Sequence, residues 1–332
     1  MNRTLSSTAK RSYWLGRYLE RAESTARLIM VNASLLYDLP KRLPLGWQPL
    51  VDITGGQALF ATLYSEPSEK NVTRFLINDA HNPASLFSSL NWIREDVRIL
   101  RGIIPRQAIE YVNEFYLFAK ESLSAPLSRT RRVQGLSRIP EFVQRLDGFM
   151  SANMLHDAHW TFLRLGNFIE RADMTSRIID VGCDNLFEAA SKLEPFIDIQ
   201  WRSVLLSLDA AQSYNTVVQS PVNQGAVLDF LICNESLPRS LAYSLNSLRN
   251  GLQDLPRNTK ILTAINRLRR SIRQTDVAGL EGEELRRYLD GFQIQLARID
   301  QAIAGVYFAS KPESQLKSKP KAKSKKELTG RT

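Results

Sequence analysis

One signature occurs twice in this chain, and it constrains the fold more than any other feature. Residues 15–27 and 165–177 share Leu, Gly, Glu, Arg, Ala, Thr and Arg at the same places. Each copy contains Glu-Arg-Ala followed by an acidic residue, at 20–23 and 170–173, and the copies lie 150 residues apart. A pattern this long, repeated at a domain-sized distance, indicates that the chain contains two related halves.

Two further matches follow the signature in the same order. Residues 75–94 match residues 230–249 at an offset of 155, and Trp47 and Trp201 lie between the blocks at an offset of 154. Helical periodicity alone does not reproduce Gly, Pro, Thr and Arg at matching places, so a slowly drifting offset indicates duplication with small insertions. A period near 150 describes domain-sized halves, because solenoid repeats are much shorter.

The apolar pattern of the chain is helical. Leu15, Leu19, Ala22, Ala26 and Ile29 step by four, three, four and three residues, which is one face of an α-helix. We find no alternating strand pattern and no Asn-Gly or Asp-Gly hairpin signal. The sequence therefore predicts an all-α fold: a duplicated helical bundle with two pseudo-twofold-related halves, residues 1–153 and residues 154–310.

Helix boundaries follow from proline, glycine and the apolar spacing. Pro83 is expected at the first helical position of its segment, where its missing N–H has no intrahelical partner. The basic stretch 128–132 is expected to be a loop, and Gly55-Gly56 should interrupt shorter helices within 47–64. The predicted helices are 7–37, 83–100, 105–122, 139–154, 158–188, 201–208, 227–232, 238–252, 259–274 and 283–309.

The repeat also predicts how the halves meet. In an isologous contact like meets like at the axis, which makes the two signature helices the natural central pair. Gly16 and Gly166 would allow these helices to approach closely, although each Gly costs about 1 kcal/mol of helix propensity relative to Ala.

Most of the net charge of +10 lies at the C-terminus. Residues 311–332 hold seven Lys and one Arg against two Glu and have little apolar surface to bury, so we predict a disordered basic tail. A solvated tail is the simplest interpretation, and weak contact with anionic partners is the alternative. Nucleic-acid binding is not favoured, because aromatic residues are not interleaved with the basic ones.

Several classes of protein are not indicated. No run approaches the ~18 apolar residues of a membrane helix, and the N-terminus does not resemble a signal peptide. Cys183 and Cys233 are too few for a disulfide framework and are expected to be packing residues. No phosphate-binding or dinucleotide-binding glycine pattern is present, so no cofactor is predicted. We expect a cytoplasmic protein that does not bind a membrane.

These blocks resemble the alpha-E family of predicted α-helical proteins with a conserved Glu-Arg motif. The resemblance covers residues 5–308, and it departs from the family's pattern at Arg11, Ser24, Asp96, Asn167, Met174 and Leu237. The matching elements are residues 13–23, Asn82-Pro83 with Ser85, residues 94–96, residues 154–157 and residues 165–177.

The resemblance implies a biological setting. Members of the family are associated, as neighbours or fusions, with circularly permuted ATP-grasp ligase-like proteins and with transglutaminase-like peptidases. It therefore implies an accessory role in a peptide-ligation or peptide-modification system, with these two proteins as partners and a peptide or amino acid as a possible ligand.

The candidate site is the charged cluster of the two signatures. Helical spacing places Glu20, Glu23 and Arg27 on one side of their helix, and a twofold arrangement would gather up to four carboxylates and four arginines. The site residues are Glu20, Arg21, Glu23, Arg27, Glu170, Arg171, Asp173 and Arg177, with Arg17, Arg94 and Asp157 as secondary candidates.

Three interpretations of this cluster stay open. A buried ion network that fixes the pairing of the halves is favoured, because a symmetric interface repeats its residues whereas a catalytic site often does not. A pocket for an anionic or zwitterionic ligand is the second, since arginines bind carboxylates and phosphates in a bidentate manner. Catalysis with a carboxylate as general base is the third.

A metal is not expected in the cluster. Carboxylate-bridged di-metal bundles need Glu-x-x-His on facing helices, and neither signature Glu has a His three residues on. His156 and His159 lie beside Asp157 in one copy only.

The leading hypothesis is a non-catalytic or accessory helical protein that partners an ATP-grasp ligase-like protein and a transglutaminase-like peptidase. In this hypothesis its Glu/Arg cluster is available to bind a zwitterionic or anionic substrate. The alternatives are a transferase or ligase component that acts catalytically through the cluster, and a purely structural adaptor.

Overall fold

The computed structural model describes residues 3–38, 46–123, 128–188 and 197–309. Across these residues the chain forms fourteen α-helices and one 3-10 helix, and no β-strand, which confirms the all-α prediction. The predicted tail, residues 311–332, lies outside the described residues. The helices are α1 Arg3–Asp38, α2 Gln48–Ile53, α3 Gln57–Leu63, α4 Glu69–Ile77, α5 Leu86–Ile99, α6 Arg106–Leu123, α7 Arg129–Asn153, α8 Ala158–Glu188, α10 Ile197–Ser207, α11 Ala211–Val217, α12 Gln224–Cys233, α13 Leu241–Gln253, α14 Thr259–Gln274, η2 Val277–Gly279 and α15 Gly282–Tyr307.

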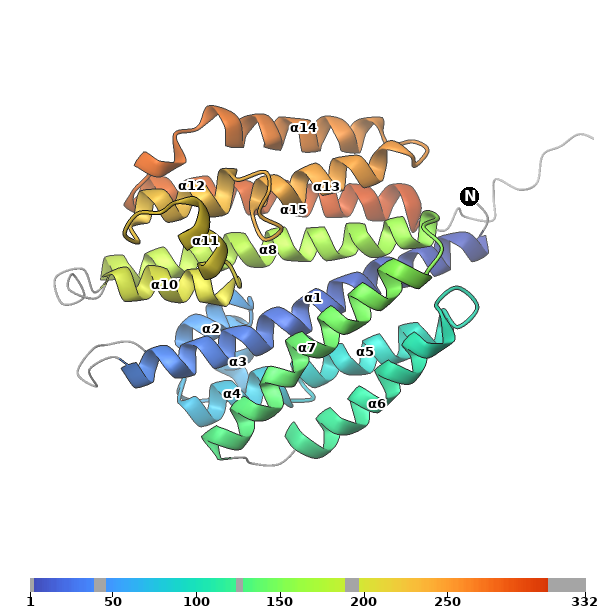
Figure 1. Cartoon of the computed structure of the whole chain (residues 1–332), viewed down its shortest axis with the longest axis horizontal. Helices are drawn as coiled ribbons and strands as arrows, with labels where there is room; N and C mark the ends of the chain where they lie inside the picture. Colours follow the sequence, from blue (N-terminus) through green and yellow to red (C-terminus); the bar gives the residue numbers. More distant parts are fainter. Residues whose placement is uncertain (1–2, 39–45, 124–127, 189–196, 310–332) are drawn as a thin grey trace, which may run out of the picture.

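The long signature helices α1 and α8 pack against each other at the centre of the molecule (Figure 1). Helices α5 and α7 pack on α1, and α6 covers both of them. In the same way α13 and α15 pack on α8, with α14 as their outer layer. The shorter helices cross between the halves, since α2 packs on α8 and α10 packs on α1. The outermost helices of the two groups are therefore α6 and α14.

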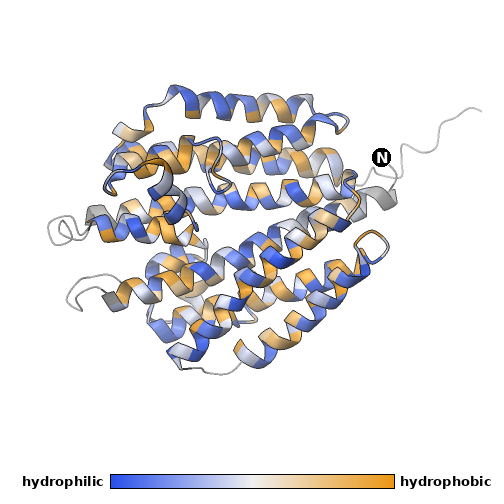
Figure 2. Cartoon of the chain, in the orientation of Figure 1, coloured by the Kyte–Doolittle hydropathy of each residue, from blue (hydrophilic) through white to orange (hydrophobic). Residues whose placement is uncertain are grey.

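The core lies along the facing sides of these helices. All five positions of the predicted apolar face, Leu15, Leu19, Ala22, Ala26 and Ile29, are buried. Trp47 and Trp201, the pair between the two repeated blocks, are buried as well. Apolar residues occur as stripes along the helices in Figure 2, as expected where each helix covers its neighbour.

Two glycines make the close approach of α1 and α8 possible. A Cβ atom on Gly16 would lie 2.1 Å from the carbonyl oxygen of Leu163, and a Cβ on Gly166 would lie 1.9 Å from that of Tyr13. Both clashes are with backbone, which a side-chain rotation does not relieve. The expectation that these glycines permit close approach is confirmed, and the contacts are reciprocal.

Two tight turns, after α2 and after α10, have similar geometry. Gly55, between α2 and α3, has a φ of 68°, and Asp209, between α10 and α11, has a φ of 54°. Their N–H groups donate to the carbonyls of Asp52 and Leu206, each three residues earlier. A left-handed backbone suits Gly, but for Asp it is an uncommon conformation. The predicted interruption at Gly55-Gly56 is therefore present.

Several predicted boundaries are wrong. The helices predicted to begin at 238, 201 and 227 begin at Leu241, Ile197 and Gln224. Pro83 does not open a helix: α5 begins at Leu86, and the hydroxyl of Ser85 caps it by accepting from the N–H of Ser88 at 3.2 Å. The basic stretch 128–132 is not a loop, because α7 begins at Arg129 and continues through Pro140. Arginine is a good helix former, and Arg132 finds a partner in Glu69 of α4, which local sequence does not reveal.

Helices α4 and α11 were not predicted. Each is short, at nine and seven residues, so a local apolar pattern has little length in which to appear. Within the described ranges, none of the helices combines the length and the apolarity that crossing a membrane requires.

Candidate functional site

The two signature glutamates form reciprocal ion pairs between the central helices. The Glu20 carboxylate accepts hydrogen bonds from Nε and Nη2 of Arg171, at 3.1 and 2.7 Å. The Glu170 carboxylate accepts one from Nε of Arg21 at 2.6 Å. The Glu of each signature therefore binds the Arg of the other, and the motif joins α1 to α8 twice.

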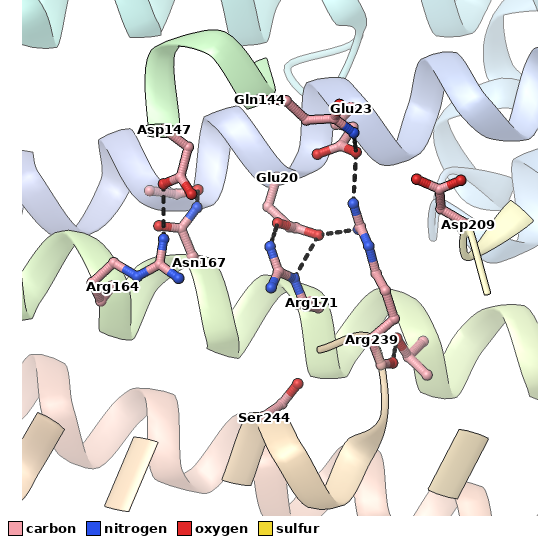
Figure 3. Close-up of polar contacts among 12 residues, drawn as sticks. Glu20, Glu23, Gln144, Asp147, Arg164, Asn167, Arg171, Asp209, Arg239 and Ser244 are labelled. Carbon is pink, nitrogen blue, oxygen red and sulfur yellow. Dashed lines mark hydrogen bonds and ion pairs between the residues drawn. The ribbon is translucent and has the colours of Figure 1, made fainter. Parts of the chain in front are cut away.

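Each of these glutamates also binds a second arginine. Nε of Arg17, on α1, donates to Oε2 of Glu170 at 2.7 Å. Nη1 of Arg239, just before α13, donates to Oε1 of Glu20 at 2.5 Å (Figure 3). Glu20 of α1 is thus held by Arg171 and Arg239, and Glu170 of α8 is held by Arg17 and Arg21 of α1.

The network of charged residues around Glu20 extends along α1. Glu23 accepts from Nη2 of Arg239 at 2.6 Å, and Gln144 of α7 also approaches it (Figure 3). Glu23 also accepts from Nη2 of Arg27 at 2.8 Å. Arg27 in turn contacts the carboxylate of Asp209 at 3.2 Å. The left-handed residue of the second turn is therefore part of this network.

The network of charged residues around Glu170 extends toward α15. Nη1 of Arg17 donates to Oδ2 of Asp300 at 3.0 Å, and the hydroxyl of Tyr13 donates to Oδ1 of the same residue at 2.5 Å. On α8, Nε of Arg177 donates to Asp173 at 3.0 Å, one helical turn apart.

The central carboxylates are buried. Glu20, Glu23 and Glu170 are each at most 2% exposed. Burial alone would raise the pKa of Glu170, but Arg21 and Arg17 outweigh it and hold this pKa at about 2. Burial likewise opposes ionisation of Glu20, yet Arg171 and Arg239 lower its pKa. A carboxylate with a lowered pKa is a weak proton acceptor at neutral pH, so neither glutamate suits a general base.

Asp173 differs from the two glutamates. Burial raises its pKa, and Arg177 only partly opposes that effect. Glu170 also acts to raise it, because the two carboxylates are like charges on the same helix. Among the acidic residues of the signatures it is therefore the one held least firmly in its ionised form.

The charges within each network balance. Around Glu20, three carboxylates (Glu20, Glu23 and Asp209) meet three guanidinium groups (Arg27, Arg171 and Arg239). Around Glu170, two carboxylates (Glu170 and Asp300) meet Arg17 and Arg21, and Asp173 pairs separately with Arg177 on α8. A charged ligand would therefore have to displace an existing partner, because neither network has a surplus of one sign.

The structure brings six of the eight primary candidates and Arg17 into these two networks and pairs the other two, Asp173 and Arg177, with each other on α8, but Arg94 and Asp157 lie elsewhere. Arg94 donates to Asn113 at 2.8 Å and lies over the ring of Tyr116, between α5 and α6. Asp157 caps α8, because its carboxylate accepts from the N–H groups of His159 and Trp160. Arg94 and Asp157 are therefore not part of the central cluster.

The histidines beside Asp157 do not converge. The ring of His156 stacks on Trp160, whereas His159 lies between Asp157 and Thr8 of α1. In the part of the chain that the structure describes, no three His, Cys, Asp or Glu side chains are grouped to hold a metal ion.

Sequence reasoning missed Arg239, Asp209, Asp147 and Asp300. A signal for the last two was present: Arg145-Leu-Asp147 on α7 matches Arg298-Ile-Asp300 on α15 at an offset of 153. Asp147 pairs with Arg164 of α8 at 2.7 Å, as Asp300 pairs with Arg17 of α1. Arg239 had no such signal, because the corresponding position of the first half is Ala84.

The fold and the site define a class: an all-helical protein whose two central helices are joined by reciprocal Glu-Arg pairs. The chain belongs to the Alpha-E family, described as a predicted alpha-helical domain with a conserved ER motif, and the match to the family covers residues 4–308. The Glu and Arg of that motif correspond here to the residues that cross between α1 and α8.

Similar proteins are found in mycobacteria. Uncharacterized proteins of Mycobacterium bovis and of Mycobacterium tuberculosis are each 24% identical to this chain over 324 residues. The match covers 89% of this chain but 34% of each relative, so the chain spans about a third of the length of these proteins. No solved structure matches the chain.

Proposed function

We propose that this protein is a non-catalytic helical partner in a peptide-ligation or peptide-modification system, and that its Glu-Arg cluster joins two duplicated halves, residues 1–153 and 154–310. Its partners are a circularly permuted ATP-grasp ligase-like protein and a transglutaminase-like peptidase. The cytoplasm is the proposed place of action, which agrees with the free thiols of Cys183 and Cys233.

The observation that carries the proposal is the reciprocal pairing of Glu20 with Arg171 and of Glu170 with Arg21. All four residues are engaged in holding α1 against α8. The corresponding packing of α5, α6 and α7 on one side and α13, α14 and α15 on the other supports the duplication. A contact of this kind specifies geometry even where it adds little net stability.

Two observations weigh against catalysis by the cluster. The pKa of Glu170 is about 2 and that of Glu20 is lowered, which disfavours proton abstraction near pH 7. The charges of both networks are already balanced by internal partners. Binding of a zwitterionic peptide or amino acid in the cluster is the second candidate, and it would require Arg239 or Arg27 to exchange one carboxylate for another.

The length of the mycobacterial relatives supports a role in association with other protein domains. In the mycobacterial proteins the matching region makes up about a third of a longer chain. A helical region within a longer polypeptide is in a position to act on neighbouring domains, and this chain would offer a similar surface to its partners.

The proposal is tested with the full chain and its two proposed partners from the same genome. Co-purification followed by light scattering should detect a complex with at least one of them at micromolar concentration. Glu170→Gln should lower the melting temperature but leave partner affinity unchanged at a temperature where the variant is folded. Glu95→Gln, which disrupts an exposed pair with Arg98, is the matched control and should change neither.

Two outcomes would contradict the proposal. The absence of a complex with either protein would remove the accessory role. A variant Glu170→Gln with unchanged stability but lost activity of the reconstituted system would show that the cluster acts on substrate instead of joining the halves.

A further inference from the structure

The outer helix of the second half is strongly basic. Helix α14 contains Lys260, Arg267, Arg269, Arg270 and Arg273 and has no Asp or Glu. Neighbouring α13 adds Arg249 and is likewise without an acidic residue. We call these six side chains the basic face of α13 and α14. Helix α14 lies at the edge of the molecule, and Figure 2 shows it mainly in hydrophilic colours (Figures 1 and 2).

The fold itself does not require this charge. Helix α6 occupies the corresponding place in the first half, and its buried positions Ala108, Val112, Phe115 and Ala119 match Ile261, Ile265, Leu268 and Ile272 at an offset of 153. The outward positions differ, since Glu114 corresponds to Arg267 and the exposed Leu117 to Arg270. The same packing therefore exists with an acidic and an apolar residue at these places.

The basic side chains lie close enough to affect one another. Burial lowers the pKa of Arg269, and the like charges of Arg249 and Arg273 lower it further. Among the described residues no carboxylate pairs with Arg267 or Arg270, and both are exposed. Mutual repulsion of this kind is relieved when an anionic partner binds.

A small concavity between α13 and α14 shows which chemical group the basic face accommodates. It has a volume of about 40 Å³ and is lined by Asn246, Arg269 and Arg273 together with Glu235 and Cys233. Oε1 of Glu235 lies 2.7 Å from Nη2 of Arg273, so one carboxylate from the chain itself already occupies the edge of this surface. Guanidinium groups bind carboxylates with a planar, two-pronged geometry, which favours arginine where such recognition is needed.

We propose that the basic face of α13 and α14 is a docking surface for an acidic segment of a partner protein. No large apolar side chain of α13 or α14 is exposed, so the face is not built to insert into lipid. Tyr243, the aromatic residue of the two helices, packs on Phe168 instead of offering a ring for base stacking. Both observations favour a protein carboxylate over a membrane or a nucleic acid.

The proposal deepens the accessory function, on which it rests only for the expectation that a partner protein exists. The test uses a fluorescein-labelled peptide rich in Glu, with fluorescence anisotropy of the full-length protein at low and at physiological salt. The variant Arg267→Glu/Arg270→Glu should weaken binding about tenfold or more, and raising the salt should weaken binding to the unmodified protein.

The matched control is Arg101→Glu/Arg106→Glu, which changes the net charge equally but lies before and at the start of α6, where both residues are exposed. It should change the affinity less than about threefold. Because Arg267 and Arg270 face outward, their replacement should leave the fold intact. Circular dichroism checks that each variant is folded.

Equal affinity in both double variants would overturn the proposal, as would tighter binding to duplex DNA or to phosphatidylserine vesicles than to the peptide. Because the assay needs no ligase or peptidase, failure here leaves the proposed complex with those proteins untouched. Failure of that complex, in turn, does not change the outcome of the peptide assay.

Discussion

The close approach of α1 and α8 at Gly16 can be tested by a single added methyl group. Replacing Gly16 by Ala places a Cβ 2.1 Å from the carbonyl oxygen of Leu163 and 2.9 Å from the backbone nitrogen of Asn167. Both atoms belong to the backbone of α8, so neither moves unless the helix moves. To reach an ordinary carbon–oxygen contact, α1 and α8 would have to separate by roughly 1 Å at their crossing.

The magnitude follows from two opposing effects. Overpacking a well-packed core destabilises a protein by about 1–3 kcal/mol, and the upper end applies here because the clash is with backbone. Ala gains about 1 kcal/mol over Gly in helix propensity. Separation also stretches the ion pairs of Glu20 with Arg171 and of Glu170 with Arg21. We therefore expect a net loss of about 2 kcal/mol, which for a chain of this size lowers the melting temperature by roughly 3 °C.

Urea denaturation and differential scanning calorimetry measure this effect. Gly148→Ala in α7 and Gly305→Ala in α15 are matched controls, because a Cβ at either glycine meets nothing within 4 Å. Both controls should raise stability by about 0.5–1 kcal/mol through helix propensity alone. Gly166→Ala should resemble Gly16→Ala, since its Cβ would lie 1.9 Å from the carbonyl oxygen of Tyr13.

The double variant sharpens the test. One separation of the helices accommodates both new methyl groups, so Gly16→Ala/Gly166→Ala should lose clearly less than the sum of the two single losses. Stabilisation by Gly16→Ala, as in the controls, would refute the packing of α1 on α8. Strictly additive losses would refute the idea that both glycines serve the same crossing.

Three further predictions concern single charged residues. Glu170→Gln should cost about 3 kcal/mol near pH 7 and flatten the acid unfolding profile between pH 4.5 and 2, because a pKa held near 2 gives stability above pH 4.5 that is lost as the pH falls. Asp96→Asn should stabilise the protein by about 2 kcal/mol at pH 7.5, but not at pH 4, in thermal melts. Burial raises the pKa of Asp96 to about 6, although Arg11 acts to lower it, so the ionised carboxylate is unfavourable in the folded protein at pH 7.5. Asp209→Gly should stabilise by about 0.5–1 kcal/mol in urea unfolding, because relief of the left-handed backbone outweighs a half-exposed pair with Arg27; a clear loss of stability would show that this pair matters more than the strain.

Much of the architecture could be read from the chain, because apolar spacing and glycine position act locally. The apolar face of α1, the limits of α8 and α14, and the close approach at Gly16 and Gly166 follow from residues near one another in sequence. The first turn of α7 could not, because its arginines alone predict a loop, and Glu69, the partner of Arg132, lies far away in the sequence.

The candidate site likewise contains some residues that the sequence predicts and others that it does not. The signature itself pointed to Glu20, Arg21, Glu170 and Arg171, but not to which Glu meets which Arg, because that depends on how α1 crosses α8. Arg239 could not be found, since it enters the site from a loop 219 residues after Glu20 and has no counterpart in the first half.

Arg239 also indicates what the site requires physically. Arg17 lies three residues before Glu20 and reaches across to Glu170, while the corresponding position of the second half is Asn167. Asn167 donates to the carbonyl of Gly16 at 3.1 Å, and its own carbonyl oxygen is buried without a partner. Glu20 would therefore be left with one guanidinium group if Arg239 did not supply the second from a different element.

An arginine at another position should be able to replace Arg239 as the second partner of Glu20. A fully buried carboxylate loses so much hydration that a single arginine does not compensate for it, so Arg239→Ala should cost about 3 kcal/mol. Adding Asn167→Arg to that variant should restore a large part of the loss, because the new side chain can reach Glu20 as Arg17 reaches Glu170. In the unaltered protein Asn167→Arg should not stabilise, since it would add a buried charge to a balanced network. If the double variant unfolds at the same urea concentration as Arg239→Ala alone, the requirement is for Arg239 at its own position and not for two guanidinium groups on each buried glutamate.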